Sequence, residues 1–518
     1  MRQSCRKEYE MYYFIPAWYQ EKLSLAWQYL SKEIEFDDTV NQSRMFAAQS
    51  LSTELLVLNY LPNLRTFLNR QQLLNISCWS LFDQLQGIEQ DKLSNIQPFN
   101  YKELNWPKDI QFIATPYVVV AMSANAMYAQ IYFNEAGNVL WIDYFEESLI
   151  HNRYVIDDRG FISSIQLYEQ GEHISTTFLN LLGEKQFIYF VEEGTFEISE
   201  NAKIQAKLKQ RFFTSKTSLF EAVLKIKIKE FTAEDVVVIA ASKEHNRYFL
   251  DNEIPGKKVM SFFSERNNDD AYIDYENIKS VDFFVADSDS ILKNIAPLTD
   301  QVPTAIISPY DSRLNLGVSQ EVKELNIWVN IDNIQIDLIY KIGELMFKEI
   351  QRNKDIRVIF ASYNEQNDQN SEIVQFVKNL NNRFISEESF NEKINALNIE
   401  IEDEEYFVFR QVREELTVIS SFSTVRLVID LSENPHLYTQ IASISAGIPQ
   451  INQRETTYVK HAENGYIIQS IEDLPLAIHY YLDTLKNWNR SLVFAIEKIA
   501  ENNSEQLVKK WTKYLEIE

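Results

Sequence analysis

Short apolar runs, separated by polar and turn-forming residues, recur along most of the chain and predict an α/β protein. The runs at residues 236–241, 259–263 and 281–286 are largely apolar and do not alternate, which is typical of parallel strands covered on both faces. A similar run at residues 12–17 predicts a first buried strand, and residues 24–30 predict the start of a helix. We therefore expect parallel sheets with helices between their strands.

Between residues 112 and 200 the pattern changes to short runs in which apolar and polar residues alternate. Alternation with a period of two is the signal of strands that have one buried face. The predicted strands are residues 129–134, 139–145, 154–157, 162–168 and 187–190, with turns at 135–138 and 157–160. The sequence thus predicts an antiparallel sheet inserted between two α/β segments.

The most informative stretch contains a strand, a helix and a second strand in close succession. A β-rich run at residues 425–431 precedes Asn434 and Pro435, which predict a helix with Asn434 as N-cap and Pro435 at its first position. Gly447 predicts the end of that helix, because glycine takes the left-handed conformation at which helices often stop. An extended run and an Asn-Gly turn then follow, at residues 448–451 and 464–465.

This order of strand, helix, Gly-x-Pro, strand and Asn-Gly resembles the donor-nucleotide half of glycosyltransferases with the GT-B fold, in which two Rossmann-like domains face each other. Retaining members carry two glutamates on the helix, and the resemblance places them at Asn434 and Ala442 of this chain. An alanine methyl cannot accept a hydrogen bond from a ribose, and the neighbouring Glu433 would point about 100° away around the helix. The resemblance therefore implies a GT-B scaffold without its donor carboxylates.

The loop after the predicted strand at residues 357–362 departs from the same pattern. The resemblance implies an arginine and a lysine there that stabilise the leaving diphosphate, whereas this chain reads Tyr-Asn-Glu-Gln from Tyr363. A glutamate in this loop would repel a diphosphate. No catalytic residue and no cofactor are expected. The predicted degenerate donor pocket consists of Tyr363, Asn434, Ala442 and Gly447.

Asp287-Ser288-Asp289 follows a predicted strand and is the candidate metal motif. Asp-x-Asp after a strand holds the divalent metal in another glycosyltransferase fold, GT-A. No further ligand cluster accompanies the motif, and the six histidines have no metal-ligand spacing. We therefore expect Asp287 or Asp289 to cap the helix that follows, and we expect no metal site.

The composition excludes several classes of partner. A net charge of −25 and a pI of about 4.8 predict repulsion of nucleic-acid backbones and anionic lipids. Two cysteines, Cys5 and Cys78, provide no disulfide framework, which is typical of a cytosolic protein. No apolar run reaches the length of about 20 residues that a membrane helix needs, and the first ten residues lack the apolar core of a signal peptide. Met1 and Met11 are both candidate start sites.

Three features together resemble one family. The opening run MYYFIPAWY from Met11, the inserted sheet and a GT-B-like end without donor chemistry are similar to the first of the accessory secretory proteins, cytosolic subunits of the accessory Sec system of streptococci and staphylococci. The insertion resembles the extended β-sheet of glycosyltransferases that modify serine-rich-repeat adhesins. The resemblance implies binding to the second and third accessory secretory proteins, to the accessory Sec motor ATPase and to the glycosylated adhesin, in the cytoplasm and peripherally at the membrane.

We therefore predict a GT-B-like pseudo-glycosyltransferase that is not an enzyme and acts in adhesin export. The alternatives are an active retaining glycosyltransferase and a stabilising subunit of a glycosyltransferase pair. Residues 331–347 predict a long helix that opens the C-terminal domain, and a last helix is expected from Leu492. The predicted segments are two Rossmann-like parts (11–111 and 201–310) around the inserted sheet (112–200), a C-terminal Rossmann-like domain (311–490) and a C-terminal helix packing on the N-terminal half (491–518).

Overall fold

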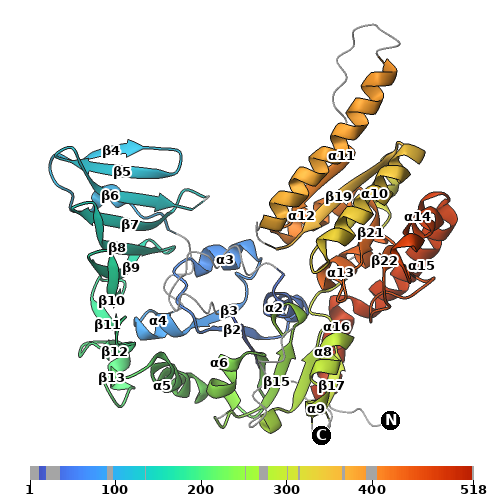
Figure 1. The fold of residues 1–518 in the computed structure, drawn as a ribbon. Coiled ribbons are helices and arrows are strands. Elements are labelled where there is room, and N and C mark those ends of the chain that lie inside the picture. Colours follow the sequence, from blue (N-terminus) through green and yellow to red (C-terminus); the bar gives the residue numbers. More distant parts are fainter. Residues whose placement is uncertain are drawn as a thin grey trace, which may run out of the picture.

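Three sheets organise the residues that the computed structural model describes (Figure 1). The structure describes residues 11–18, 36–89, 97–134, 136–250, 252–267, 278–299, 302–312, 316–364, 368–392 and 405–515. The helix predicted at residues 24–30 lies outside these residues. Across the described ranges, no helix combines the length and the apolar character that a membrane span requires.

The N-terminal half is built on a parallel sheet whose order, among the described strands, is β17-β16-β15-β14-β1-β2-β3. Its strands are β1 (Tyr12–Ile15), β2 (Thr53–Val57), β3 (Ser77–Ser80), β14 (Val236–Ala240), β15 (Lys257–Phe262), β16 (Phe283–Ala286) and β17 (Thr304–Ile306). The runs predicted as parallel strands are therefore confirmed. Strand β14 pairs directly with β1, so the long insertion between them leaves the sheet continuous.

The central strands of this sheet are buried on both sides because helices cover both of its faces. They are α2 (Asp38–Ala48), α3 (Leu64–Arg70), α4 (Leu81–Leu85), α5 (Lys216–Ile228), α6 (Lys243–His245), α7 (Ser264–Asn267), α8 (Asp289–Asn294) and α9 (Ala296–Thr299).

The inserted segment forms an antiparallel sheet that projects from the N-terminal half (Figure 1), with the order β13-β12-β11-β10-β9-β8-β7-β6-β5-β4 among the described strands. Phe178 and Phe187 pack one face of it onto Phe82 of α4, and Trp106 covers the other face near Tyr144. The strands are β4 (Gln111–Ala114), β5 (Val118–Ser123), β6 (Ala126–Phe133), β7 (Val139–Glu146), β8 (Leu149–Asp157), β9 (Phe161–Glu169), β10 (Glu172–Leu179), β11 (Lys185–Phe190), β12 (Thr195–Ile198) and β13 (Phe212–Phe213).

The C-terminal half contains a second parallel sheet, with the order β20-β19-β18-β21-β22-β23 among the described strands. They are β18 (Leu325–Asn330), β19 (Ile356–Ser362), β20 (Phe407–Gln411), β21 (Val425–Asp430), β22 (Gln450–Asn452) and β23 (Gly465–Ile467). Its helices are α10 (Ile336–Arg352), α11 (Asp368–Glu392), α12 (Glu415–Phe422), α13 (Leu437–Ala446) and α14 (Leu474–Leu482). Together the sheets confirm the predicted α/β fold with an antiparallel sheet; the exact domain boundaries stay predictions.

Two predicted helices of this half are present, but their predicted bounds are wrong. The helix expected at residues 331–347 begins only at Ile336, because Asn333 takes the left-handed conformation (φ 58°) and separates β18 from α10. The helix expected from Leu492 is part of α15 (Leu485–Asn502), and a separate helix, α16 (Ser504–Leu515), follows it.

Helix α16 returns to the N-terminal half and packs against α2 (Figure 1). Trp511 is fully buried there and meets Phe46 edge to face, with the ring centroids 5.5 Å apart. The Nζ of Lys257 donates to the carbonyl of Leu515 at 2.7 Å. The end of the chain thus ties the C-terminal half to the first sheet.

Candidate functional site

The candidate site lies where the C-terminal sheet faces the N-terminal half. Asp332 follows β18, Tyr363 follows β19, and Asp430 ends β21. These are the carboxyl ends of adjacent parallel strands, which is where open α/β sheets bind their ligands. The residues that gather there therefore decide what the site can hold.

Tyr363 lies folded over the start of α13. Its backbone N–H donates to Oδ2 of Asp332 at 2.6 Å, and its hydroxyl is 2.5 Å from Oγ1 of Thr439. Its ring stacks on the imidazole of His436, with centroids 3.7 Å apart and 21° between the planes. The loop that the GT-B resemblance assigns to the donor diphosphate is thus closed down onto the helix that the resemblance assigns to the donor.

Phe36 of the N-terminal half completes this packing. Its ring centroid lies 5.3 Å from that of Tyr363, 4.8 Å from that of Tyr438 and 6.0 Å from that of His436, each edge to face. Its carbonyl accepts a hydrogen bond from the hydroxyl of Tyr310. We call Phe36, Tyr363, His436 and Tyr438 the aromatic plug. The plug fills the space between the two halves at the carboxyl edge of the sheet.

Acidic groups surround the plug. Asp332 also accepts from Oγ of Ser362 at 2.7 Å, and burial raises the pKa of its carboxyl. The surrounding protein also raises the pKa of Glu265, although its side chain is 47% exposed, and the nearby Asp430 raises it further. Burial lowers the pKa of His436 to about 4, so its Nε2, 3.7 Å from Oε1 of Glu265, carries no charge at neutral pH. A diphosphate placed here would meet carboxylates and a neutral imidazole instead of cations.

The predicted cap of α13 is wrong. The helix begins at Leu437 and its N-cap is His436, whose Nδ1 accepts from the N–H of Thr439. The cause is Asp430, because its carboxylate accepts from the N–H groups of Ser432 and His436 at 3.1 and 2.9 Å. Residues 432–434 form a bend between these two hydrogen bonds.

The predicted site residue Asn434 and its neighbour Glu433 therefore lie outside the helix. Asn434 is exposed in the bend that precedes α13. Glu433, expected one position out of register on the helix, instead forms an ion pair with Arg454 at 2.9 Å. The structure thus does not bring Asn434 into the site with Tyr363.

Gly447 ends α13 in the left-handed conformation, with φ 73°, which confirms this prediction. A Cβ at this position would lie 2.2 Å from Cδ1 of Leu492 on α15. Gly447 therefore permits both the left-handed turn and the close approach of α15.

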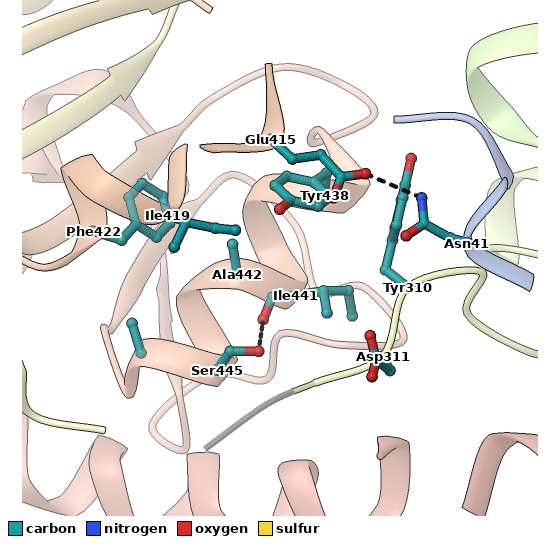
Figure 2. Close-up of a pocket in the computed structure, with 11 residues that line it drawn as sticks. Asn41, Tyr310, Asp311, Glu415, Ile419, Phe422, Tyr438, Ile441, Ala442 and Ser445 are labelled. Atoms are coloured by element: carbon teal, nitrogen blue, oxygen red, sulfur yellow. Dashed lines mark hydrogen bonds between the residues drawn. The ribbon is translucent and has the colours of Figure 1, made fainter. Parts of the chain in front are cut away.

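Ala442 lies on one side of a cavity of about 180 Å³. Figure 2 shows Ile419 and Phe422 of α12 on one side of it and Tyr310 and Asn41 on the other, with α13 between them. The Nδ2 of Asn41 donates to Oε1 of Glu415 at 3.1 Å (Figure 2). The cavity is mainly apolar and lies between the two halves.

Asp287-Ser288-Asp289 packs as part of the fold. The N-cap of α8 is Ser288, whose Oγ accepts from the N–H of Ile291, so the expectation of an aspartate cap is wrong. The Oδ2 of Asp287 accepts from the N–H and Oγ of Ser264 at 2.6 and 2.5 Å. No group of three potential metal ligands occurs among the described residues.

A protein-family model described as accessory Sec system protein Asp-1 matches residues 11–518. The chain belongs to this family. A relative from Streptococcus gordonii with the same description is 33% identical over 98% of this chain and 99% of its own length. A second, from Staphylococcus aureus, is 30% identical over 98% of this chain and 99% of its own length.

Solved structures agree with the Asp-1 family assignment. A glycosylation-associated protein complex (Gap123) from Streptococcus agalactiae contains a chain with a TM-score of 0.80 and 33% identity, covering 97% of this chain and 100% of that one. A chain in a structure of accessory secretory proteins 1, 2 and 3 from Streptococcus pneumoniae has a TM-score of 0.79 and 32% identity, and the match covers 98% of this chain and 99% of that one. The pneumococcal O-GlcNAc transferase GtfA has a TM-score of 0.72 at 12% identity, and the match covers 98% of this chain and 99% of that one. This likeness confirms the GT-B-like fold.

Several residues of the site were not predicted from the sequence of this Asp-1 family member. Asp332 was assigned to a helix because strand β18 was missed, and Phe36, His436 and Tyr438 carry no motif. A signal for Asp332 exists, because a polar residue directly after a buried strand lies at the edge where ligands bind. Nothing local marks Phe36, since its contacts are with residues of the other half.

Proposed function

We propose that this chain is a non-catalytic subunit of the accessory Sec export machinery that binds the second and third accessory secretory proteins and the glycosylated serine-rich-repeat adhesin. The observation that carries the proposal is the aromatic plug, because it occupies the place that the GT-B resemblance assigns to a donor diphosphate. Binding a nucleotide sugar would require Phe36 and Tyr363 to leave their ring contacts. It would then bring phosphate charge next to Asp332 and Glu265.

Contacts between the two halves support a scaffold with a fixed shape. Glu415 of the C-terminal half pairs with Arg44 at 3.5 Å, in addition to its bond with Asn41. The hydroxyl of Tyr458 donates to the carbonyl of Asp287 at 2.7 Å. These contacts and the plug hold the two halves together. In this proposal the protein works by binding partners through its surface. It does so in the cytoplasm and peripherally at the membrane, beside the motor ATPase.

The predicted site residues follow the same proposal. Tyr363 packs on His436, and Asn434 is a solvent-exposed residue between a strand and a helix. Ala442 lines an apolar cavity, and Gly447 permits the approach of α15. None of them binds a sugar donor or a cofactor in this interpretation. We also retain the five segments (11–111, 112–200, 201–310, 311–490 and 491–518) as the proposed division of the chain, to be tested by limited proteolysis.

Titration calorimetry with UDP-GlcNAc and UDP-glucose tests the lack of donor binding. We expect no heat of binding up to millimolar nucleotide sugar, and no transfer to a serine-rich peptide. GtfA provides the positive control, since its solved structure holds UDP and GlcNAc. A micromolar dissociation constant, or turnover, would restore the alternative of an active glycosyltransferase.

Co-purification tests the subunit role. The tagged chain is expressed with the second and third accessory secretory proteins, and a complex containing all three is expected on size exclusion. Binding to a glycosyltransferase instead of these partners would favour the alternative of a stabilising subunit.

A further inference from the structure

The turn between β8 and β9, residues 158–160, attaches the middle of the inserted segment to the N-terminal half. The N–H of Asp158 donates to the carbonyl of Pro62 at 2.8 Å, and the N–H of Gln97 donates to the carbonyl of Asp158 at 2.8 Å. The N–H of Thr66, on α3, donates to Oδ2 of Asp158 at 2.7 Å. We call this turn and the residues that bind it the β8–β9 joint. The joint is an attachment in addition to the apolar packing of the sheet on α4.

Two arginines and two aspartates form the ionic part of the joint. Arg159 donates to both carboxylate oxygens of Asp157, at 2.6 and 2.7 Å, and to both of Asp83 on α4, at 2.8 and 3.0 Å. Arg65 of α3 donates to Oδ2 of Asp83 at 2.7 Å. These four residues are at most 8% exposed, and their charges balance. Because bidentate pairs are geometrically specific, Arg159 fixes the direction of the turn relative to α4.

Asp158 adds a third carboxylate to the joint, and both guanidinium groups are already bound to the other two. Asp158 is only 7% exposed. Its Oδ1 is buried and has no hydrogen-bond partner among the described residues. A buried carboxylate with neither a counter-ion nor a full set of hydrogen bonds is costly in its ionised form. A proton on Asp158 removes this excess negative charge.

The surroundings of Asp158 favour its neutral form. The charged and titratable groups around the joint are Asp157 and Arg159 of the strand end and turn, Arg65 of α3, Asp83 of α4, Cys78 of β3 and Tyr60. Burial raises the pKa of the Cys78 thiol to about 12 and also raises that of Tyr60, so both are uncharged at neutral pH. Burial and, after it, the charge of Asp157 raise the pKa of Asp158 to about 7, against the hydrogen bond from Thr66.

The direction of the pH dependence follows from this difference. An aspartate in water has a pKa near 4, so Asp158 binds its proton more tightly in the docked turn than in an undocked one. The docked state is therefore most stable below about pH 4 and loses stability as the pH rises towards about 7. Asp83 acts in the opposite direction, because Arg159 and Arg65 outweigh its burial and lower its pKa. Its contribution is lost only below about pH 4.

We propose that Asp158 makes the β8–β9 joint proton-sensitive, so that the outer strands of the inserted sheet are held firmly when Asp158 is protonated and more loosely when it is ionised. Phe178 and Phe187 hold β10 and β11 on Phe82 by apolar packing, which involves no titratable group. Strands β4 to β7 stand away from the N-terminal half (Figure 1) and depend on the joint for their position. The inference concerns the conformation of this chain alone and goes beyond the proposed function.

Hydrogen exchange of the purified chain, followed by mass spectrometry and corrected for the intrinsic pH dependence of exchange, measures opening of the joint. The N–H groups of Thr66, Gln97 and Asp158 bridge it. Their protection should fall at least tenfold between about pH 5 and about pH 7 and change little above that, since one shifted group changes stability by up to about tenfold per pH unit. Asp158→Asn keeps an acceptor for Thr66 and cannot ionise, so its protection should stay constant within about twofold.

A second measurement follows the position of the sheet. Fluorophores are attached at Tyr117, at the tip of the inserted sheet, and at Leu416 of α12, which are 88% and 70% exposed, and single-molecule energy transfer gives the distribution of distances between them. The wild type should show a narrower distribution at about pH 5 than at about pH 7.5. Asp158→Asn should be narrow at both pH values. Arg159→Lys loses the bidentate pairs and should be broad at both. Melting curves establish that each variant folds.

The outcomes are distinct. Protection that does not depend on pH in the wild type, or that depends on it equally in Asp158→Asn, overturns the inference. Protection that falls as the pH falls would show that the paired aspartates control the joint, which also overturns it. The same holds if the distance distribution is identical in the wild type and both variants. Every measurement uses the chain without partners, so failure here is separate from failure of the proposed function.

Discussion

Removal of the Tyr363 ring is the most direct perturbation of the aromatic plug. In the native protein this ring stacks on His436 and meets Phe36 edge to face, and its hydroxyl bonds with Thr439. Tyr363→Ala removes all three contacts. Tyr363→Phe removes the hydroxyl alone and is the matched control.

The expected magnitudes follow from these contacts. Aromatic pairs contribute about 0.5–1.5 kcal/mol each, and a typical hydrogen bond about 1 kcal/mol. We therefore expect Tyr363→Ala to lower the free energy of unfolding of the C-terminal half by about 3 kcal/mol. Tyr363→Phe should lower it by about 1 kcal/mol. The difference between the two variants measures the ring packing.

Thermal melting followed by tryptophan fluorescence is a suitable assay, because Trp328 and Trp488 are buried in the C-terminal half. For a unit of this size, about 1 kcal/mol corresponds to about 2–4 °C in Tm. Tyr363→Ala should thus melt about 6–12 °C below the wild type, and Tyr363→Phe about 2–4 °C below it. Equal Tm values for the two variants would refute the ring packing. Micromolar binding of UDP-GlcNAc by Tyr363→Ala would refute the electrostatic argument.

Three further predictions concern other positions. Burial lowers the pKa of His436 to about 4, so the protein should lose stability as pH falls from about 6.5 towards 4, where the buried ring must take up a proton. His436→Asn keeps an acceptor at the helix cap but does not titrate, and its Tm should therefore fall less than that of the wild type over this pH range. An equal fall in Tm would contradict the prediction. Gly447→Ala should lower the free energy of unfolding, measured in urea, by about 2 kcal/mol, since the new Cβ would lie 2.2 Å from Leu492. Adding Leu492→Ala to this variant should restore part of the lost free energy. Trp511→Ala should lower the free energy of unfolding by about 3–5 kcal/mol, because the Trp511 side chain is fully buried. An unchanged Tm would contradict the packing of α16 on the N-terminal half.

Local periodicity was sufficient for most strands and for the class of fold. The apolar runs at residues 236–241 and 281–286 correspond to β14 and β16, because a strand covered on both faces needs no polar positions. Alternation identified five strands of the insertion, while short strands such as β4 and β13 were missed, because two to four residues show no period. Gly447 was predictable because a left-handed backbone excludes most other residues at low energy.

Element boundaries near the site were less predictable, since side chains from elsewhere decide them. Asn434 and Pro435 form a good local start signal, yet Asp430 holds the N–H of His436 and delays the helix. The strand β18 was missed because its sequence, LNIWVN, contains two asparagines and does not alternate. Asn330 is accommodated because its Nδ2 donates to Oδ2 of Asp430 at 2.7 Å, a partner on the neighbouring strand.

The sequence by itself determined the scaffold, because the strands and helices depend on residue types at fixed local spacing; the resemblance to GT-B enzymes added the prediction that the donor glutamates are absent. Only the tertiary structure decided which residues gather at the carboxyl edge of the second sheet. Phe36, Tyr363 and His436 are far apart in the chain, and periodicity tells which face of an element is buried, not which distant residue covers it. The aromatic plug exists because the two halves are held face to face, and that arrangement results from contacts such as those of Glu415 and Trp511.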